Sequence, residues 1–202
     1  WNSVIGTTIV IKGVTRDLLH DPTGVIYSHR SVDGMWLPGG ASSTGAGAIA
    51  AAFPAENLDA LNAAAQQGAP SRVVVYPLTG KGERYPFAAT EAEGFTIGSA
   101  SSMEEKYLAT LQGIAFIERL AFDALRHIGA PMSGPFTISG GATKSEALNQ
   151  IRASVLERQL AIPRVTEGAF GMAMLAAAQD SSIAEVTERM VRIERTIDPA
   201  RR

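Results

Sequence analysis

The sequence predicts an α/β domain with one mixed β-sheet, and three observations support that prediction. Short runs of β-branched and aromatic residues, separated by turn residues, fill residues 1–40 and are typical of antiparallel strands. From there to the C-terminus, helix-like and strand-like segments alternate, which favours helices packed on a sheet. The 202 residues are 46% hydrophobic and 19% charged, a balance typical of a packed globular domain.

Three strands make up the expected antiparallel part. Residues 4–11 are β-branched apart from one glycine, so we predict a single buried strand there. A turn at 21–24 precedes a second strand at 25–29, and the Asp33-Gly34 turn precedes a third at 35–37. We expect these strands to pair in sequence order as a meander.

Helices and strands alternate in the rest of the chain. Ser102 with Glu105, and Thr143 with Glu146, have capping-box spacing and predict two helix starts. The segment 129–131 (Gly-Ala-Pro) predicts the end of the longer of these helices. The predicted helices cover residues 48–52, 55–66, 102–129, 143–156, 168–178 and 182–192, and the predicted strands cover residues 73–76, 94–97, 135–138 and 160–163.

Charge and composition exclude several classes of function. A formal net charge of −2 provides no broad cationic face for nucleic acid or acidic lipid. The absence of cysteine excludes disulfides, iron–sulfur clusters and thiolate zinc sites, and it suits a reducing compartment. No apolar run reaches the roughly 18 residues of a membrane span, and no signal-peptide pattern is present. We therefore expect a cytoplasmic globular domain that contacts neither nucleic acid nor membrane.

Glycines cluster where strands meet loops or helices. The segment 39–47 precedes one expected helix, Gly140-Gly141 precedes another, and Gly6 stands next to Thr7-Thr8. Glycine lets a backbone N–H approach a ligand oxygen closely, and a helix N-terminus adds partial positive charge. Each cluster taken alone is more often a tight turn or a site of close helix packing. Neither a Walker loop nor a dinucleotide fingerprint within a parallel βαβ unit is present.

Five segments stand in a characteristic order: Gly6-Thr7-Thr8, Gly45, residues 77–86 (PLTGKGERYP), Ser139-Gly140-Gly141-Ala142 and residues 167–171 (EGAFG). In this order and at these intervals they resemble the C-terminal half of the FGGY family of carbohydrate kinases, which includes glycerol kinase, xylulokinase, gluconokinase and ribulokinase. The likeness covers nearly the whole chain. It implies the actin-like, ribonuclease-H-like ATPase fold, with two such domains per polypeptide, and phosphate transfer from ATP to a sugar or polyol.

The resemblance also implies a nucleotide-binding set. Thr7 matches a phosphate-contacting threonine in the family's Gly-Thr turn, and Gly45 matches the glycine of the second phosphate-side loop; the residue four positions later, Ile49, is apolar here. Ser145 occupies a position that often carries an asparagine facing the adenine. The complete implied set is Gly6, Thr7, Thr8, Gly45, Gly140, Gly141, Ala142 and Ser145. The resemblance implies no metal ligand and no catalytic residue in this chain.

The loop at residues 79–86 has two interpretations of about equal weight. In one, it lies on the phosphate side or closes the cleft, with Lys81 or Arg84 near anionic groups. In the other, it is a solvated surface loop in which Glu83 and Arg84 neutralise one another. Local sequence does not separate the two.

The functional expectation follows from the resemblance. In the family, the catalytic aspartate lies just upstream of the strand that opens this chain, and the sugar pocket lies mostly in an N-terminal domain. Because Trp1 leads directly into strand-like sequence, we expect residues 1–202 to be the C-terminal nucleotide-binding domain of a two-domain sugar kinase. Such a piece would use ATP with Mg²⁺ but transfer no phosphate alone.

Two further expectations stay open. The departures from the family pattern at Ile49, Ser99 and Lys106 leave room for an actin-like nucleotide-binding or partner-binding module without kinase activity. Apolar surface that an N-terminal domain normally covers can also promote self-association, so a homodimer is considered.

Overall fold

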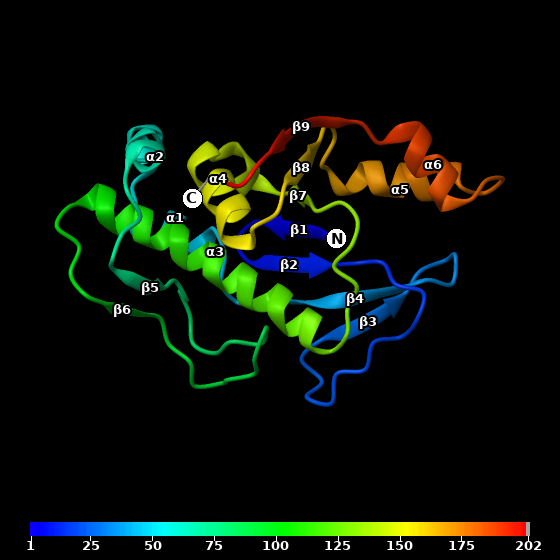
Figure 1. Cartoon of the computed structure of the whole chain (residues 1–202), viewed down its shortest axis with the longest axis horizontal. Coiled ribbons are helices and arrows are strands. Elements are labelled where there is room, and N and C mark those ends of the chain that lie inside the picture. The colour runs from blue at the N-terminus through cyan, green and yellow to red at the C-terminus, as the bar shows by residue number, and fades with distance from the viewer. Residues whose placement is uncertain (201–202) are drawn as a thin grey trace.

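The computed structural model of the chain describes residues 1–200 and contains a seven-stranded sheet, a two-stranded sheet and helices packed against them (Figure 1). The strands are β1 (Asn2–Ile5), β2 (Ile9–Lys12), β3 (Tyr27–Arg30), β4 (Trp36–Ala41), β5 (Val74–Tyr76), β6 (Phe95–Ile97), β7 (Thr137–Ser139), β8 (Leu160–Pro163) and β9 (Ile193–Ile197). The helices are α1 (Gly47–Ala52), α2 (Leu58–Gln67), α3 (Met103–His127), α4 (Glu146–Leu156), α5 (Gly168–Ala177) and α6 (Ile183–Met190), with 3-10 turns η1 (Ala55–Asn57) and η2 (Gly141–Lys144). The predicted mixed α/β architecture is confirmed.

The run of β-branched residues at 4–11 is a hairpin, so the prediction of one strand is wrong. β1 and β2 pair antiparallel with Ile5 opposite Ile9, and the Gly6 N–H donates to the Thr8 carbonyl at 3.1 Å. Ile5, Ile9 and Ile11 are fully buried. Strand propensity alone cannot show where a chain reverses, whereas the hairpin lets both halves of this apolar run reach the same core.

The strand order also differs from a simple meander. The large sheet has the order β3-β4-β2-β1-β7-β8-β9, so β4 rather than β3 pairs with β2. Gly39 and Gly40 in β4 are buried, and a Cβ atom on Gly39 would lie 1.8 Å from the Ile11 carbonyl oxygen. These glycines therefore permit the close approach of β4 to β2, while the mostly exposed β3 takes the sheet edge.

Four strands of the large sheet run in the same direction. β1 is parallel to β7 and β7 to β8, while β4 is antiparallel to β2, which is itself antiparallel to β1. The C-terminal ends of β1, β4, β7 and β8 therefore lie along one edge of the sheet, which we call the carboxyl edge. Ligand crevices in α/β sheets form outside such ends.

The long helix α3 crosses one face of the large sheet and packs against α2, α4 and β5 (Figure 1). Leu111, Ile114 and Leu125 of α3 are fully buried in the same core cluster as the β1–β2 hairpin. The predicted cap at Ser102 is confirmed, since its side chain accepts the Glu105 N–H. These contacts place the β1–β2 turn at a fixed position relative to α3.

The start of α4 differs from the prediction by three residues. Thr143 lies in η2, where its hydroxyl donates to the Gly140 carbonyl at 2.8 Å. Ser145 is the actual N-cap, because its side chain accepts the Leu148 N–H at 3.2 Å. Two hydroxyl residues only two positions apart make the local capping signal ambiguous, and the 3-10 turn after Gly140 places the cap at the second of them.

The C-terminal part contains one strand that the sequence did not predict. The helix expected at 182–192 ends at Met190, and β9 then pairs antiparallel with β8. β9 is an edge strand, and its register against β8 shifts between Ile162 and Pro163 of β8. Its residues are largely exposed, so it lacks the alternation of buried and exposed residues that marks a half-buried strand. No helix within residues 1–200 is long and apolar enough to cross a membrane.

Candidate functional site

The first two glycine bends meet directly at the carboxyl edge. The Gly45 backbone lies so close to the β1–β2 turn that a Cβ atom there would be 2.6 Å from the Thr7 carbonyl oxygen. The Ala46 N–H donates to the Gly6 carbonyl at 2.9 Å, and the Gly47 N–H donates to the Thr7 carbonyl at 3.1 Å. Two segments far apart in sequence therefore form one backbone surface, and only glycine fits at position 45.

The third bend lies on the other side of β1. Gly140 follows β7 with φ of +90°, in the left-handed region that favours glycine, and its Cβ would be 2.6 Å from the Ile5 carbonyl oxygen. Because Ile5 is followed by Gly6, this bend is adjacent to the β1–β2 turn. The structure thus brings the three predicted bends together at one edge.

The bends also leave part of their backbone unpaired and open to another molecule. Cβ atoms placed on Gly6 or Gly141 would have no atom within 4 Å, so neither glycine is required by packing. The Thr7 side chain is exposed. Within residues 1–200, the backbone N–H groups of Thr7, Thr8 and Gly141 have no protein acceptor. The edge therefore presents free donors and a backbone that another molecule can approach.

Ser145 is engaged with neighbouring helices. Its hydroxyl donates to the Asn62 side-chain oxygen at 2.5 Å in addition to capping α4. Tyr107 of α3, almost fully buried, adjoins Ser145 and Asn62, and burial raises the pKa of its phenol. This cluster joins α2, α3 and α4 one turn away from Gly141, so Ser145 sits beside the bends with its side chain already occupied.

Ile49 is a core residue. Its side chain is buried in the main hydrophobic cluster, on the inner face of α1. The apolar residue at this position therefore contributes packing under the bend rather than a polar contact.

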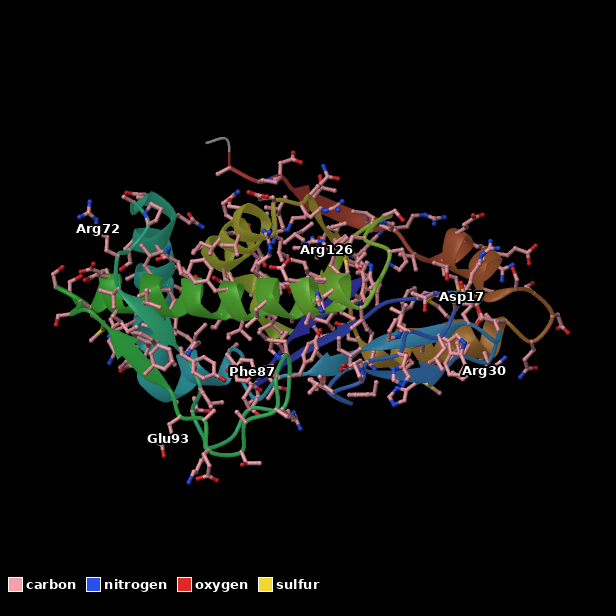
Figure 2. The ribbon with its side chains drawn as sticks, turned by 60° about the horizontal axis from the view of Figure 1, so that its bottom comes forward. Asp17, Arg30, Arg72, Phe87, Glu93 and Arg126 are labelled. Carbon is pink, nitrogen blue, oxygen red and sulfur yellow. The ribbon has the colours of Figure 1, made fainter. Side chains whose placement is uncertain are left out.

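The structure contradicts the second interpretation of the loop between β5 and β6, in which Glu83 and Arg84 neutralise one another on a solvated surface. Glu83 is only 3% exposed, and it binds Ser42, Ser43, Thr44 and Tyr76 rather than the Arg84 side chain. Lys81 forms an exposed ion pair with Glu91. Figure 2 shows Phe87 on this loop, with Glu93 at its outer side.

Tyr85 anchors the same loop a second time. Its fully buried ring packs so closely on Gly40 that a Cβ atom at that position would lie 2.5 Å from the ring. The Tyr85 hydroxyl donates to the Ala121 carbonyl at 2.9 Å. Glu83 and Tyr85 therefore make a buried connection between the end of β4 and α3, while Arg84 between them is exposed. Local sequence could not reveal this connection, because Glu83 and Ser42 are 41 positions apart. The one local signal for Glu83 was an acidic residue directly after Gly82.

Other parts of the described chain offer less to a phosphate-bearing ligand. No group of three or more His, Cys, Asp or Glu side chains within residues 1–200 is arranged to hold a metal ion. A cavity of about 540 Å³ lies between α2, α3 and α4 and is lined by residues such as Ala65, Leu108 and Gln150. None of the eight predicted site residues lines it, so we place the candidate site at the bends, where the free donors are.

Comparisons with known proteins show which family this chain matches. Residues 2–179 match the C-terminal domain of the FGGY family of carbohydrate kinases. Glycerol kinase of Vibrio parahaemolyticus serotype O3:K6 is 31% identical over 132 residues, which are 62% of this chain and 26% of that protein. This chain therefore spans about a quarter of that relative's length.

Solved structures share the fold over nearly the whole chain. A xylulose kinase from Rhodospirillum rubrum superposes with a TM-score of 0.81 at 27% identity, covering 98% of this chain and 42% of that one. A Plasmodium falciparum glycerol kinase solved with ADP gives a TM-score of 0.79 at 16% identity, with coverage of 98% and 42%. The actin-like ATPase fold expected from the sequence is confirmed.

Proposed function

We propose that this chain, which belongs to the FGGY family of carbohydrate kinases and matches the C-terminal domain of that family, is the ATP-binding half of a kinase that phosphorylates a sugar or polyol. One observation carries the proposal: three glycine bends, following β1, β4 and β7, meet at the carboxyl edge around free backbone donors. The P. falciparum glycerol kinase, whose fold this chain shares, was solved with ADP, which supports the choice of ligand.

Each predicted residue receives a role in this proposal. ATP supplies the phosphoryl group that is transferred. The exposed hydroxyl of Thr7, with the N–H groups of Thr7 and Thr8, binds phosphate oxygens, while Gly6 leaves room for them. Gly45 keeps the second bend in contact with that turn. Along the adenosine, the backbone from Gly140 to Ala142 passes close to the ligand, and Ser145 fixes the start of α4 beside it.

Mg²⁺ is the proposed companion of the nucleotide. Since residues 1–200 contain no cluster of metal-ligating side chains, the chain fits Mg²⁺ only as an ion carried by the phosphates. Phosphoryl transfer also needs a positioned acceptor hydroxyl. We propose that an N-terminal domain of the same polypeptide supplies the sugar pocket and the general base, so that residues 1–202 alone transfer no phosphate.

The cellular setting and the assembly state complete the proposal. A cysteine-free sequence suits the reducing cytoplasm. A homodimer stays a prediction, which sedimentation equilibrium across a range of protein concentrations tests directly.

Calorimetric titration of the 202-residue chain with ADP tests the binding half of the proposal. We expect weak but saturable binding, because part of the cleft comes from the other domain. Adenosine is the matched control, because it lacks the phosphates that the Thr7 turn is proposed to bind, and it should bind more weakly. A flat ADP titration at millimolar concentration contradicts the proposal.

The second candidate is an actin-like nucleotide- or partner-binding module without kinase activity. The engaged hydroxyl of Ser145 favours it, because that side chain is not free to contact a base. Assaying the full-length protein against ketoses, aldoses and polyols separates the two candidates. Nucleotide binding without phosphorylation of any acceptor would support the module.

A further inference from the structure

Glu83 is a buried carboxylate surrounded by neutral hydrogen-bond donors. Its Oε2 accepts from the hydroxyls of Ser42 at 2.9 Å, Thr44 at 3.2 Å and Tyr76 at 2.9 Å. Its Oε1 accepts the backbone N–H groups of Ser43 at 2.6 Å and Arg84 at 3.0 Å. No Lys, Arg or His in the described part of the chain forms an ion pair with it.

A carboxylate is required by this set of donors. Burying a charged group is costly unless hydrogen bonds replace its hydration, and here six donors do so, the sixth being the Tyr85 N–H at 3.5 Å from Oε1. An ionised carboxylate only accepts, whereas a glutamine side chain would direct an N–H₂ group at donors. Ser42 also has a fixed role, because its hydroxyl donates to Glu83 while accepting the Thr44 N–H at 2.9 Å.

The donors lie directly before the second glycine bend. The Ser42 N–H donates to the Ile9 carbonyl, and the Ile9 N–H donates to the Thr44 carbonyl, so this segment is also bonded to the start of β2. The next residue, Gly45, packs on Thr7. A continuous chain of contacts thus runs from the Glu83 carboxylate through Ser42–Thr44 to the β1–β2 turn.

We propose that Glu83 is a positioning residue for the phosphate end of the nucleotide site. Its carboxylate fixes the segment 42–44, and through Gly45 it fixes the Thr7-Thr8 turn. Glu83 itself does not touch the nucleotide. This inference rests on the proposed function, since it assigns the phosphates to that turn.

The experiment compares ADP with adenosine in Glu83→Gln and in a matched control. Glu83→Gln should lower ADP affinity at least about tenfold, the equivalent of roughly 1.4 kcal/mol, and change adenosine affinity less than about twofold. Glu91→Gln removes the same charge from the same loop at an exposed position and should change neither affinity. An unchanged ratio of ADP to adenosine affinity in folded Glu83→Gln overturns the inference.

Two further measurements cover the remaining outcomes. If Glu83→Gln does not fold, Tyr76→Phe removes a single donor and should lower ADP affinity a few-fold without affecting adenosine; no change in the affinity ratio overturns the inference. If the unmodified chain binds neither ligand, the proposed function fails separately. Amide NMR then tests positioning: the signals of Thr7, Thr8 and Gly45 should move in the variant, those of Gly140–Ala142 should not, and unmoved signals at Gly45 overturn it.

Discussion

At the scale of single residues, the glycines of the carboxyl edge fall into two kinds. Gly45 and Gly140 stand where a Cβ atom would collide with backbone, so the fold itself requires them. Gly6 and Gly141 face open space, so the folded chain alone does not. The same residue type therefore serves packing at two positions and leaves an accessible surface at two others.

This difference predicts opposite behaviour for two adjacent variants. Gly140→Ala should lower the free energy of unfolding by about 1–3 kcal/mol, because φ of +90° and the Ile5 carbonyl both oppose a side chain. Gly141→Ala should stay within about 0.5 kcal/mol of the original protein yet weaken ADP binding, because its methyl group enters the ligand's space. Urea unfolding and ADP titration check the pair; a Gly141→Ala protein that binds ADP normally contradicts the assignment of that surface.

Thr7 tests the hydroxyl directly. Thr7→Val keeps the shape of the side chain but removes its donor, so ADP affinity should fall by about ten- to a hundredfold, the size expected for a hydrogen bond to a charged group. Thr7→Ser retains the hydroxyl and serves as the control. Calorimetry with ADP measures both, and equal affinities for the two variants would assign the phosphates elsewhere.

At the scale of elements, one buried ion pair joins α3 to α4. The Arg152 guanidinium binds both carboxylate oxygens of Glu118 at 2.7 Å, and it also contacts the Ser3 hydroxyl of β1 at 3.1 Å. Arg152 and Glu118 are both fully buried. The pair therefore connects the helical layer to the strand that leads into the Gly6–Thr8 turn.

Breaking that pair should cost far more than breaking an exposed one. Arg152→Met leaves the Glu118 charge buried and should lower the free energy of unfolding by about 3–5 kcal/mol. Arg126→Met removes an exposed partner of Asp123 on α3 and should cost less than about 1 kcal/mol. Replacing both partners, as Arg152→Met with Glu118→Leu, should recover most of the loss. Denaturant unfolding of all three proteins measures these differences, and equal losses in the two single variants would contradict the prediction.

The N-terminus of α3 predicts a pH dependence. Hydrogen bonds from the Ser101 hydroxyl and the Ser101 N–H lower the pKa of Glu105 below its ordinary value of 4.5. This contribution to stability is therefore present above pH 4.5 and lost as the pH falls through the lowered pKa. The free energy of unfolding should decrease less steeply below pH 4.5 in Glu105→Gln than in the original protein; identical acid limbs in denaturant melts would contradict this.

At the scale of the whole molecule, the candidate site exists because of chain direction. β1, β4, β7 and β8 all end at the same edge, so segments separated by most of the sequence meet there (Figure 1). The β5–β6 loop connects the segment before the second bend to α3, because Glu83 accepts from Ser42 and Tyr85 donates to the Ala121 carbonyl. One ligand at this edge can therefore contact all three bends.

A single titration can test this convergence. Addition of ADP to the isotope-labelled chain should shift the amide signals of residues 6–8, 45–47 and 140–142 with one common dissociation constant. Surface residues far from the edge, such as those of α6, provide the internal control. Shifts confined to one segment, or different constants for different segments, would show that the bends do not form one site.

Much of the chain could be predicted from local sequence. Composition and the alternation of apolar segments predicted a mixed α/β domain, and the Ser102 box predicted the start of α3. The glycine-bearing segments were found because glycine and hydroxyl residues are local signals. β9 was missed because an exposed edge strand carries an ambiguous local pattern. The cap at Ser145 was misplaced because Thr143, two positions earlier, is an equally good local candidate.

The sequence by itself determined which segments can form glycine bends and which residues carry hydroxyls, because backbone freedom and side-chain chemistry belong to each residue. Only the tertiary structure decided that β4 lies between β3 and β2, and that Glu83 reaches Ser42 from 41 positions away. Such contacts depend on which strands pair and on what the core buries. These are properties of the folded chain as a whole, and no local pattern encodes them.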